Sequence, residues 1–291
     1  MKFPTQIVIG GSLAVLNIAA AQAVTLVGLN SQNQLARIDT SNVAGAVNID
    51  ITGLASGDRF IGIDTRPKDG KIYGITLSNK IYTVDEMSGA ASFVAGLSNA
   101  VIQANQGWGL DFNPVADAGA GASLRLIGSA GNNYAVNATT GAVGNLAGMI
   151  APGYSAVAYT NSMPGQLSAP ASTALYYINS ASDTLSMASS GFNAPTITTV
   201  GSLGLDVLRA NGFEILGNGQ AYAALNEDAG SSLVTGVYGI NLASGQAALL
   251  GTYNGTLSGL TVSAVPEPQT YALLMLGLLA VGTLSRRRKA A

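Results

Sequence analysis

The sequence predicts an all-β fold of the β-propeller type, with about five four-stranded blades followed by a short C-terminal transmembrane helix. Two observations predict the propeller. Short segments alternate apolar with small or polar residues over four to six positions, and a set of four such segments recurs every 46 to 54 residues. A period of two is typical of a half-buried strand, and four strands at this repeat length are typical of a propeller blade. A third observation, in the last 27 residues, predicts the helix.

The repeat is clearest between Lys71 and Pro114. Its predicted strands are 71–76, 80–85, 91–94 and 107–114. The same order recurs upstream at 26–29, 34–39, 46–49 and 60–67. It recurs downstream at 124–128, 133–137, 140–143 and 154–159, then at 174–178, 183–187, 196–200 and 212–215, and finally at 221–225, 236–240, 246–250 and 257–260. No long segment between residues 24 and 262 shows the apolar period of an amphipathic helix, so almost no helix is expected there.

Several recurring residues have a structural explanation. Gly89, Gly141 and Gly245 each follow Ser or Thr between predicted strands, where a turn requires a positive φ that glycine adopts without strain. Asp64 and Asp111 each precede an Arg or Asn and then a Pro, so we expect their carboxylates to accept hydrogen bonds from the turn that follows. Trp108, the only tryptophan, is expected in the core.

The repeat resembles a family of exported bacterial domains of unassigned function. The resemblance rests on Ile72-Tyr73-Gly74, on Ile81-Tyr82-x-Val84-Asp85 with Ser88-Gly89, and on the paired segments 62–67 and 109–114. It covers about residues 25 to 262 and implies a propeller-like fold without supplying an activity. The third unit has Ala158 where Asp64 and Asp111 stand, so a ring of equivalent aspartate ligands is not expected.

The C-terminal tail combines three elements in a fixed order. Val265-Pro266-Glu267-Pro268 is followed by the uncharged segment 270–284 and then by the basic cluster Arg286, Arg287, Arg288 and Lys289. The apolar segment is shorter than the roughly 20 residues of a standard spanning helix, but it is long enough for a thin bilayer. Because basic residues stay on the cytoplasmic side, the cluster stops transfer and leaves the proline motif on the outer side.

This tail closely resembles the PEP-CTERM sorting signal of Gram-negative bacteria. The matching residues are Val265, Pro266, Glu267, Pro268 and Thr270. The resemblance implies that an exosortase recognises the motif and removes the helix. The alternative is an ordinary C-terminal anchor with a chance Pro-Glu-Pro.

The N-terminus is typical of a secretory signal peptide. Met1-Lys2 is weakly basic, residues 7–20 are apolar, and Ala21 and Ala23 form an A-x-A cleavage site. We therefore divide the chain into a signal peptide at 1–23, a repeat domain at 24–262 and a sorting tail at 263–291. The protein is expected to be exported, anchored transiently in the inner membrane, and then placed at the cell surface or outside the cell.

Composition excludes several classes of chemistry. The chain has no Cys and no His, which removes disulfides, thiolate and imidazole metal sites, and the Ser-His-Asp triad. The predicted mature part has eight Lys and Arg against fourteen Asp and Glu, a net charge of −6, so no nucleic-acid partner is expected. Between Arg125 and Asp206 the only charged residue is Asp183.

Candidate catalytic and metal sites are sparse. Asp85-Glu86 and Glu227-Asp228 are sequence neighbours, which point to opposite faces of a strand and so form no natural catalytic pair. The segments 111–117 and 226–228 offer oxygen ligands without the calcium-loop spacing. We therefore expect no catalytic residues, no metal and no cofactor.

The function predicted from these observations is non-catalytic binding of exopolysaccharide or another surface polymer in the extracellular matrix. Signal peptidase and exosortase are the expected processing partners. Aromatic residues in the nearly uncharged middle are candidates for stacking on sugars: Tyr134, Tyr154, Tyr159, Tyr176 and Tyr177. The alternative is a polysaccharide hydrolase or lyase in which Asp64 and Asp111 converge from adjacent blades at the propeller axis.

Overall fold

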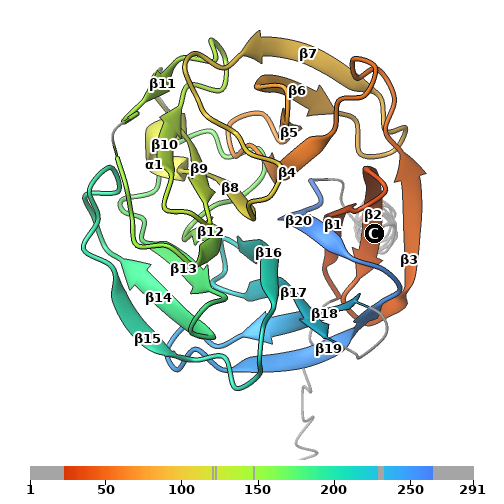
Figure 1. Cartoon of the computed structure of the whole chain (residues 1–291), viewed down its shortest axis with the longest axis vertical. Helices are drawn as coiled ribbons and strands as arrows, with labels where there is room; N and C mark the ends of the chain where they lie inside the picture. The colour runs from red at the N-terminus through yellow and green to blue at the C-terminus, as the bar shows by residue number, and fades with distance from the viewer. Residues whose placement is uncertain (1–22, 120, 122, 147, 229–232, 265–291) are drawn as a thin grey trace, which may run out of the picture.

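The computed structural model describes residues 23–264 except 120, 122, 147 and 229–232. Five four-stranded antiparallel sheets surround a central axis like the blades of a propeller (Figure 1). The sorting motif at 265–270, the apolar segment at 270–284, the basic residues 286–289 and Ala21 of the predicted cleavage site lie outside the described residues, whereas Ala23 of that predicted site is the first described residue.

Four of the five blades run from an inner strand to an outer strand in chain order. One blade contains β4 (Phe60–Thr65), β5 (Ile72–Thr76), β6 (Lys80–Val84) and β7 (Ala91–Gly96). The next contains β8 (Trp108–Phe112), β9 (Leu124–Gly128), β10 (Asn133–Val136) and β11 (Val143–Gly144). It is followed by β12 (Tyr154–Tyr159), β13 (Leu175–Asn179), β14 (Thr184–Ala188) and β15 (Thr198–Ser202). Then come β16 (Arg209–Ile215), β17 (Ala221–Asp228), β18 (Leu233–Ile240) and β19 (Ala247–Tyr253).

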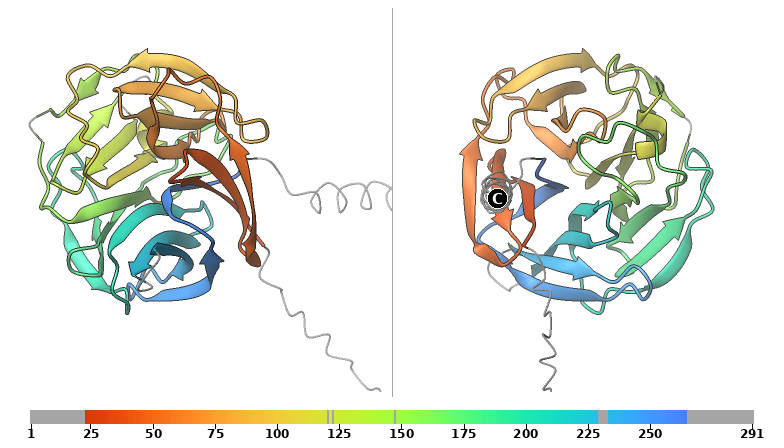
Figure 2. Two further views of the ribbon diagram at one scale, coloured as in Figure 1. Left: turned by 45° about the vertical axis from the view of Figure 1, so that its right-hand side comes forward. Right: turned by 180° about the vertical axis from the view of Figure 1, so that it is seen from behind.

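The remaining blade joins the two ends of the domain. Its strands are β20 (Leu257–Val262), β1 (Thr25–Asn30), β2 (Gln34–Asp39) and β3 (Asn42–Asp50), in that order from the axis. β20 pairs with β1 so that Val262 lies opposite Leu26. The C-terminal strand therefore closes the ring, and the domain's first and last strands lie side by side (Figure 2).

The predicted strands are present, but their grouping into blades was wrong by one strand. Residues 60–65 begin the next blade rather than ending the first, and 108–112, 154–159 and 209–215 are likewise inner strands. The cause is ring closure, because β20 supplies the inner strand of the first blade and shifts every later unit by one. The only helix of the described residues is α1 (Pro114–Asp117), a single turn capped by the Asn113 side chain.

Apolar side chains pack between neighbouring blades rather than around one centre. One cluster joins β5 and β6 to β8, β9 and β10 and includes Trp108, which is 4% exposed, so its expected core position is confirmed. The turn glycines are also confirmed: φ is +70° at Gly89, +72° at Gly141 and +85° at Gly245. At Gly89 a Cβ atom would lie 2.0 Å from the carbonyl oxygen of Asp50, so both conformation and space require glycine there.

Candidate functional site at the propeller axis

The five inner strands place equivalent residues at one level of the axis. Two residues before that level, each strand carries Gly or Ala: Gly62, Gly109, Ala156, Gly212 and Gly259. These small residues let the inner strands approach closely. A Cβ atom on Gly212 would lie 2.6 Å from the backbone nitrogen of Leu260 and 2.4 Å from its Cβ atom. The residues at the level itself are Asp64, Asp111, Ala158, Glu214 and Thr261.

Three of these five residues are acidic and lie together. One carboxyl oxygen from each of Asp64, Asp111 and Glu214 lies within 4.8 Å of the other two. Their exposed fractions are 2%, 2% and 3%. We call Asp64, Asp111 and Glu214 the axial carboxyl cluster.

The level also carries hydrogen bonds from one blade to the next. The backbone N–H of Phe112 donates to Asp64 Oδ2 at 2.7 Å, and that of Tyr159 donates to Asp111 Oδ1 at 2.9 Å. Val262 N donates to Glu214 Oε2 at 3.2 Å. Thr65 N donates to Thr261 Oγ1 at 2.8 Å. Four of the five junctions between inner strands are therefore bridged by a side chain.

The surroundings of the cluster favour protonated carboxyl groups. Burial raises the pKa of Glu214 to about 7. Burial, followed by the negative charge of Glu214, raises the pKa of Asp64 well above its ordinary value. Burial and then the charges of Asp64 and Glu214 raise the pKa of Asp111 in the same direction. Desolvation and like-charge repulsion both penalise the ionised form.

No cation from the described part of the chain neutralises the cluster. Within the described part of the chain, ion pairs join Arg37 to Glu86 and Arg66 to Asp117. The distance from Arg66 Nε to Asp117 Oδ1 is 2.7 Å. The buried Arg125 donates instead to the Tyr159 hydroxyl and to the amide oxygens of Asn133 and Asn193.

The cluster offers few oxygens for a metal ion. Both oxygens of Asp64, one of Asp111 and one of Glu214 already accept hydrogen bonds, from Phe112 N, the Thr261 hydroxyl, Tyr159 N and Val262 N. Calcium takes six to eight oxygen ligands. Hydrogen bonds from neighbouring strands therefore compete with any cation for four of the six carboxyl oxygens of the cluster.

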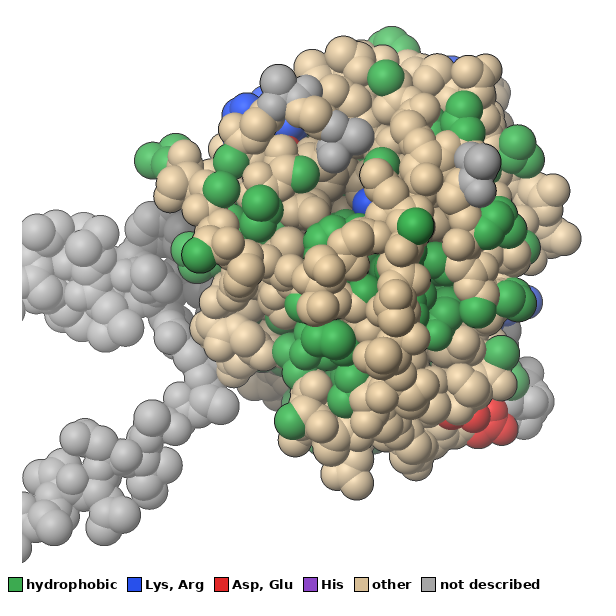
Figure 3. Space-filling view, turned by 90° about the vertical axis from the view of Figure 1, so that its left-hand side faces the viewer, with side chains coloured by type: hydrophobic (Ala, Val, Ile, Leu, Met, Phe, Trp, Pro, Cys, Tyr) green, Lys and Arg blue, Asp and Glu red, His purple; other side chains and the backbone are tan. Residues whose placement is uncertain are grey.

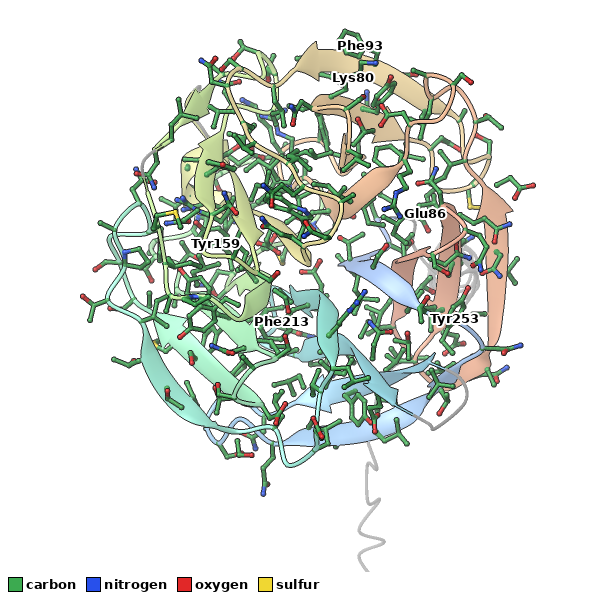
Figure 4. The ribbon with its side chains drawn as sticks, in the orientation of Figure 1. Lys80, Glu86, Phe93, Tyr159, Phe213 and Tyr253 are labelled. Carbon is green, nitrogen blue, oxygen red and sulfur yellow. The ribbon has the colours of Figure 1, made fainter. Side chains whose placement is uncertain are left out.

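The axis has little free space beside the cluster. A cavity of about 10 Å³ lies at the level of the small residues and is lined by Gly62, Gly109, Ala156, Gly212 and Gly259 with their neighbours. This volume corresponds to about one water molecule. A larger groove of about 310 Å³ lies where the described chain ends. Its lining includes Lys71, Ala264 and Glu86, and the last of these is labelled in Figure 4.

The structure assigns the two aspartates a different role from the predicted one. The expected turn hydrogen bonds at Asp64 and Asp111 were wrong, because both side chains point to the neighbouring blade and accept its backbone N–H groups. The predicted convergence of Asp64 and Asp111 from adjacent blades is confirmed. Sequence reasoning missed Glu214 and Thr261, although Gly212-Phe213-Glu214 repeats the Gly-x-Asp pattern of Gly62-Ile63-Asp64.

The other candidates have structural contacts. In the segment 111–117, Asn113 caps α1 and Asp117 accepts from Arg66 and Ser123. In the segment 226–228, Asn226 accepts from the Thr235 hydroxyl and donates to the Leu257 carbonyl.

Four of the five tyrosines considered for sugar stacking are buried: Tyr134, Tyr154, Tyr159 and Tyr177 are at most 9% exposed. The stacking role was wrong for these four, because they fill the apolar space between blades. Tyr176 is partly exposed.

Three solved structures match this chain at low identity and with TM-scores below 0.5. Regucalcin from Agrobacterium tumefaciens, described as a calcium-binding protein, is 13% identical with a TM-score of 0.39, and the match covers 77% of this chain and 67% of that one. A protein of unknown function from Bacteroides thetaiotaomicron is 12% identical with a TM-score of 0.48. The match covers 79% of this chain and 58% of that one. Sqt1 of Saccharomyces cerevisiae is 14% identical with a TM-score of 0.38, covering 79% and 72%. No curated protein matches the sequence.

Two family matches cover most of the chain. Residues 264–289 match the PEP-CTERM protein-sorting motif, which indicates export, transient anchoring in the membrane and processing by an exosortase. Within the described part of the chain, no helix is long and apolar enough to cross a membrane. Residues 34–261 match a second family, and the chain accordingly belongs to the family described as Domain of unknown function (DUF4394).

Proposed function

We propose that the mature domain is a non-catalytic propeller of the extracellular matrix that binds exopolysaccharide or another surface polymer. Signal peptidase removes residues 1–23 before the sorting tail is processed. The domain then acts as a rigid ring whose rim and loops contact the polymer.

The closed axis is the observation that supports this proposal over a hydrolase. A glycosidase needs two carboxyl groups about 5 to 9.5 Å apart, with the sugar between them. One oxygen from each member of the axial carboxyl cluster lies within 4.8 Å of the other two, and the members are only 2–3% exposed, so a sugar has no access between them. The adjoining cavity of about 10 Å³ has room for a water molecule and not for a sugar ring. These carboxyl groups are better suited to holding blades together than to cleaving a polymer.

The surface is compatible with a neutral or weakly charged polymer. Figure 3 views the side of the ring that carries β10 to β15, and few charged side chains appear on it. Solubility there rests on hydroxyl, amide and backbone groups, which also hydrogen-bond to sugars. Affinity should therefore depend little on salt.

The outer strands supply an exposed aromatic ring. Phe93 on β7 is 61% exposed and packs edge-on against Tyr82 at a centroid distance of 5.7 Å. Figure 4 places Phe93 at the outer rim, near Lys80. An aromatic face fixed by a neighbouring ring, with polar groups close by, is a suitable platform for a sugar.

Calorimetry tests the binding proposal directly. The exported protein, purified from the cell surface, is titrated with exopolysaccharide of the producing organism at low and high salt. We expect measurable heat at both salt concentrations and no release of reducing ends. Release of reducing ends would favour the hydrolase, and absence of heat with any surface polymer would contradict binding.

A pair of rim variants locates the contact. Phe93→Ala should weaken binding roughly three- to tenfold, because it removes one stacking platform. Val47→Ala is the matched control, since Val47 lies on the outer strand β3 and is also 61% exposed. Equal affinity of both variants and the parent would exclude Phe93 from the binding surface.

Intact-mass spectrometry of the same protein tests the processing. We expect a chain that begins at Val24 and lacks Arg286 to Lys289. A product that retains the basic cluster would show that the tail remains an anchor.

A further inference from the structure

The axial carboxyl cluster contains more acceptors than its hydrogen-bond donors can satisfy. The Thr261 hydroxyl lies 2.9 Å from Asp64 Oδ1 and 3.0 Å from Glu214 Oε2, yet it has one hydrogen to donate. One carboxyl oxygen of Asp64 and one of Glu214 also lie within 4.8 Å of each other. A hydrogen bond between two carboxyl groups requires a proton on one of them.

The strands around the cluster supply no compensating charge. β12 contributes Ala158 and Tyr159, and the Tyr159 hydroxyl is held by Arg125 of β9 at 3.3 Å. β20 contributes the neutral Thr261, and Arg66, which follows β4, is paired with Asp117. Asp64, Asp111 and Glu214 themselves are the ionisable groups that β4, β8 and β16 contribute at this level.

The cluster also lies where the ring is held closed. Glu214 bridges β16 to β20, and Asp64 bridges β4 to β8 while accepting from Thr261 of β20. Because β20 is the C-terminal strand and pairs with β1, these contacts join the two ends of the domain. Repulsion inside the cluster would act directly on this closure.

We propose that the axial carboxyl cluster holds shared protons at neutral pH and makes closure of the ring dependent on pH, so that the domain is tightest in acidic surroundings and loosens as the medium becomes alkaline. An exported protein experiences the pH of its surroundings, so the effect would operate where the protein is placed.

The sign follows from proton binding. The folded-state pKa of Glu214, about 7, is above its ordinary value of 4.5, so the folded state binds more protons than the unfolded state between these values. This contribution to stability is complete below about pH 4.5 and is lost as the pH rises through 7. The raised pKa values of Asp64 and Asp111 act in the same direction.

Thermal melts of the exported protein between pH 5 and pH 8.5 test the proposal. We expect the melting temperature to fall by roughly 5–10 °C over this range. Glu214→Gln and Asp111→Asn keep the shape of the side chain and an acceptor oxygen while removing one acidic group. Each should flatten the pH profile, and the double variant should flatten it most.

Asp206→Asn is the matched control, since Asp206 is exposed and does not belong to the axial carboxyl cluster. It should leave the parent's pH profile unchanged. A flat profile in the parent, or variants that keep the parent's slope, would overturn the proposal.

Two further measurements separate protons from a metal ion and from misfolding. Repeating the melts with calcium chloride or with a chelator should leave the profile unchanged. A calcium-dependent rise at pH 8.5 that disappears in both variants would instead assign the compensating charge to a cation and overturn proton sharing. Carbon-13 NMR of the side-chain carboxyl groups in the unmodified protein needs no variant. It should reveal carboxyl groups that remain protonated at pH 6, and complete ionisation by pH 6 would contradict the proposal.

Discussion

Two neighbouring junctions of the ring are closed by different interactions. Between β8 and β12, Asp111 accepts a hydrogen bond from the Tyr159 backbone N–H. Between β12 and β16, the equivalent position is Ala158, which offers no acceptor. Ala156, Ala158, Phe213 and Ile215 instead belong to one buried apolar cluster. Figure 4 shows Phe213 on β16 in the interior of the ring.

This difference indicates that the axis tolerates only a limited number of buried carboxyl groups close to one another. A carboxyl group supplies an acceptor for a buried N–H but raises the cost of every other carboxyl group within a few ångströms. With three acidic residues already within 4.8 Å, a neutral Ala158 and a neutral Thr261 limit that repulsion.

The largest expected effect comes from placing a side chain where two inner strands approach each other closely. Gly212→Val should destabilise the domain by about 3 kcal/mol or more, because the new side chain would overlap Leu260 of β20. Gly96→Val is the control, since a Cβ atom there meets nothing within 4 Å. Chemical denaturation compares the two, and equal stabilities would contradict the close approach of β16 and β20.

Making the apolar junction acidic should have the next largest effect. Ala158→Asp would place a fourth carboxyl group at the axis, and we expect a loss of about 2–3 kcal/mol at neutral pH. The loss should be larger at pH 8 than at pH 5, because repulsion requires ionised groups. Denaturation at both pH values measures it. If the substitution stabilised the domain at pH 8, the repulsion argument would fail.

A turn outside the axis separates conformational strain from crowding. Gly89→Val should cost about 2 kcal/mol, because φ is +70° and the new Cβ would press on the Asp50 carbonyl oxygen. Gly57→Val should cost about 1 kcal/mol, since φ there is +76° but the space is open. Thermal melts of both variants provide the comparison. Equal losses would show that crowding at Gly89 relaxes without cost.

The sequence predicted the strands well because each one alternates or is flanked by turn residues. It did not predict the grouping into blades, because the pairing of β20 with β1 joins residues more than 200 positions apart. No local pattern in residues 25–30 or 257–262 indicates which strand comes first in a sheet. The sorting tail was predictable because its motif, apolar segment and basic cluster form one continuous stretch of sequence.

The axial carboxyl cluster was only half visible in the sequence. Asp64 and Asp111 share a Gly-x-Asp pattern followed by proline, whereas Glu214 lacks the proline and carries one more methylene group. Its longer side chain still reaches the same axis. The direction of the aspartate side chains was also not predictable, because it depends on the neighbouring blade and not on the turn that follows them.

The central claim is that the axial carboxyl groups hold the blades together and perform no chemistry on a polymer. Asp64→Ala tests it most directly, because it leaves the buried Phe112 N–H without its acceptor. We predict a stability loss of about 1–3 kcal/mol at pH 5, where repulsion between carboxylates is smallest, with polymer binding retained by the folded fraction and no polymer cleavage by either protein. A variant of unchanged stability that loses a polymer-cleaving activity present in the parent would contradict the account.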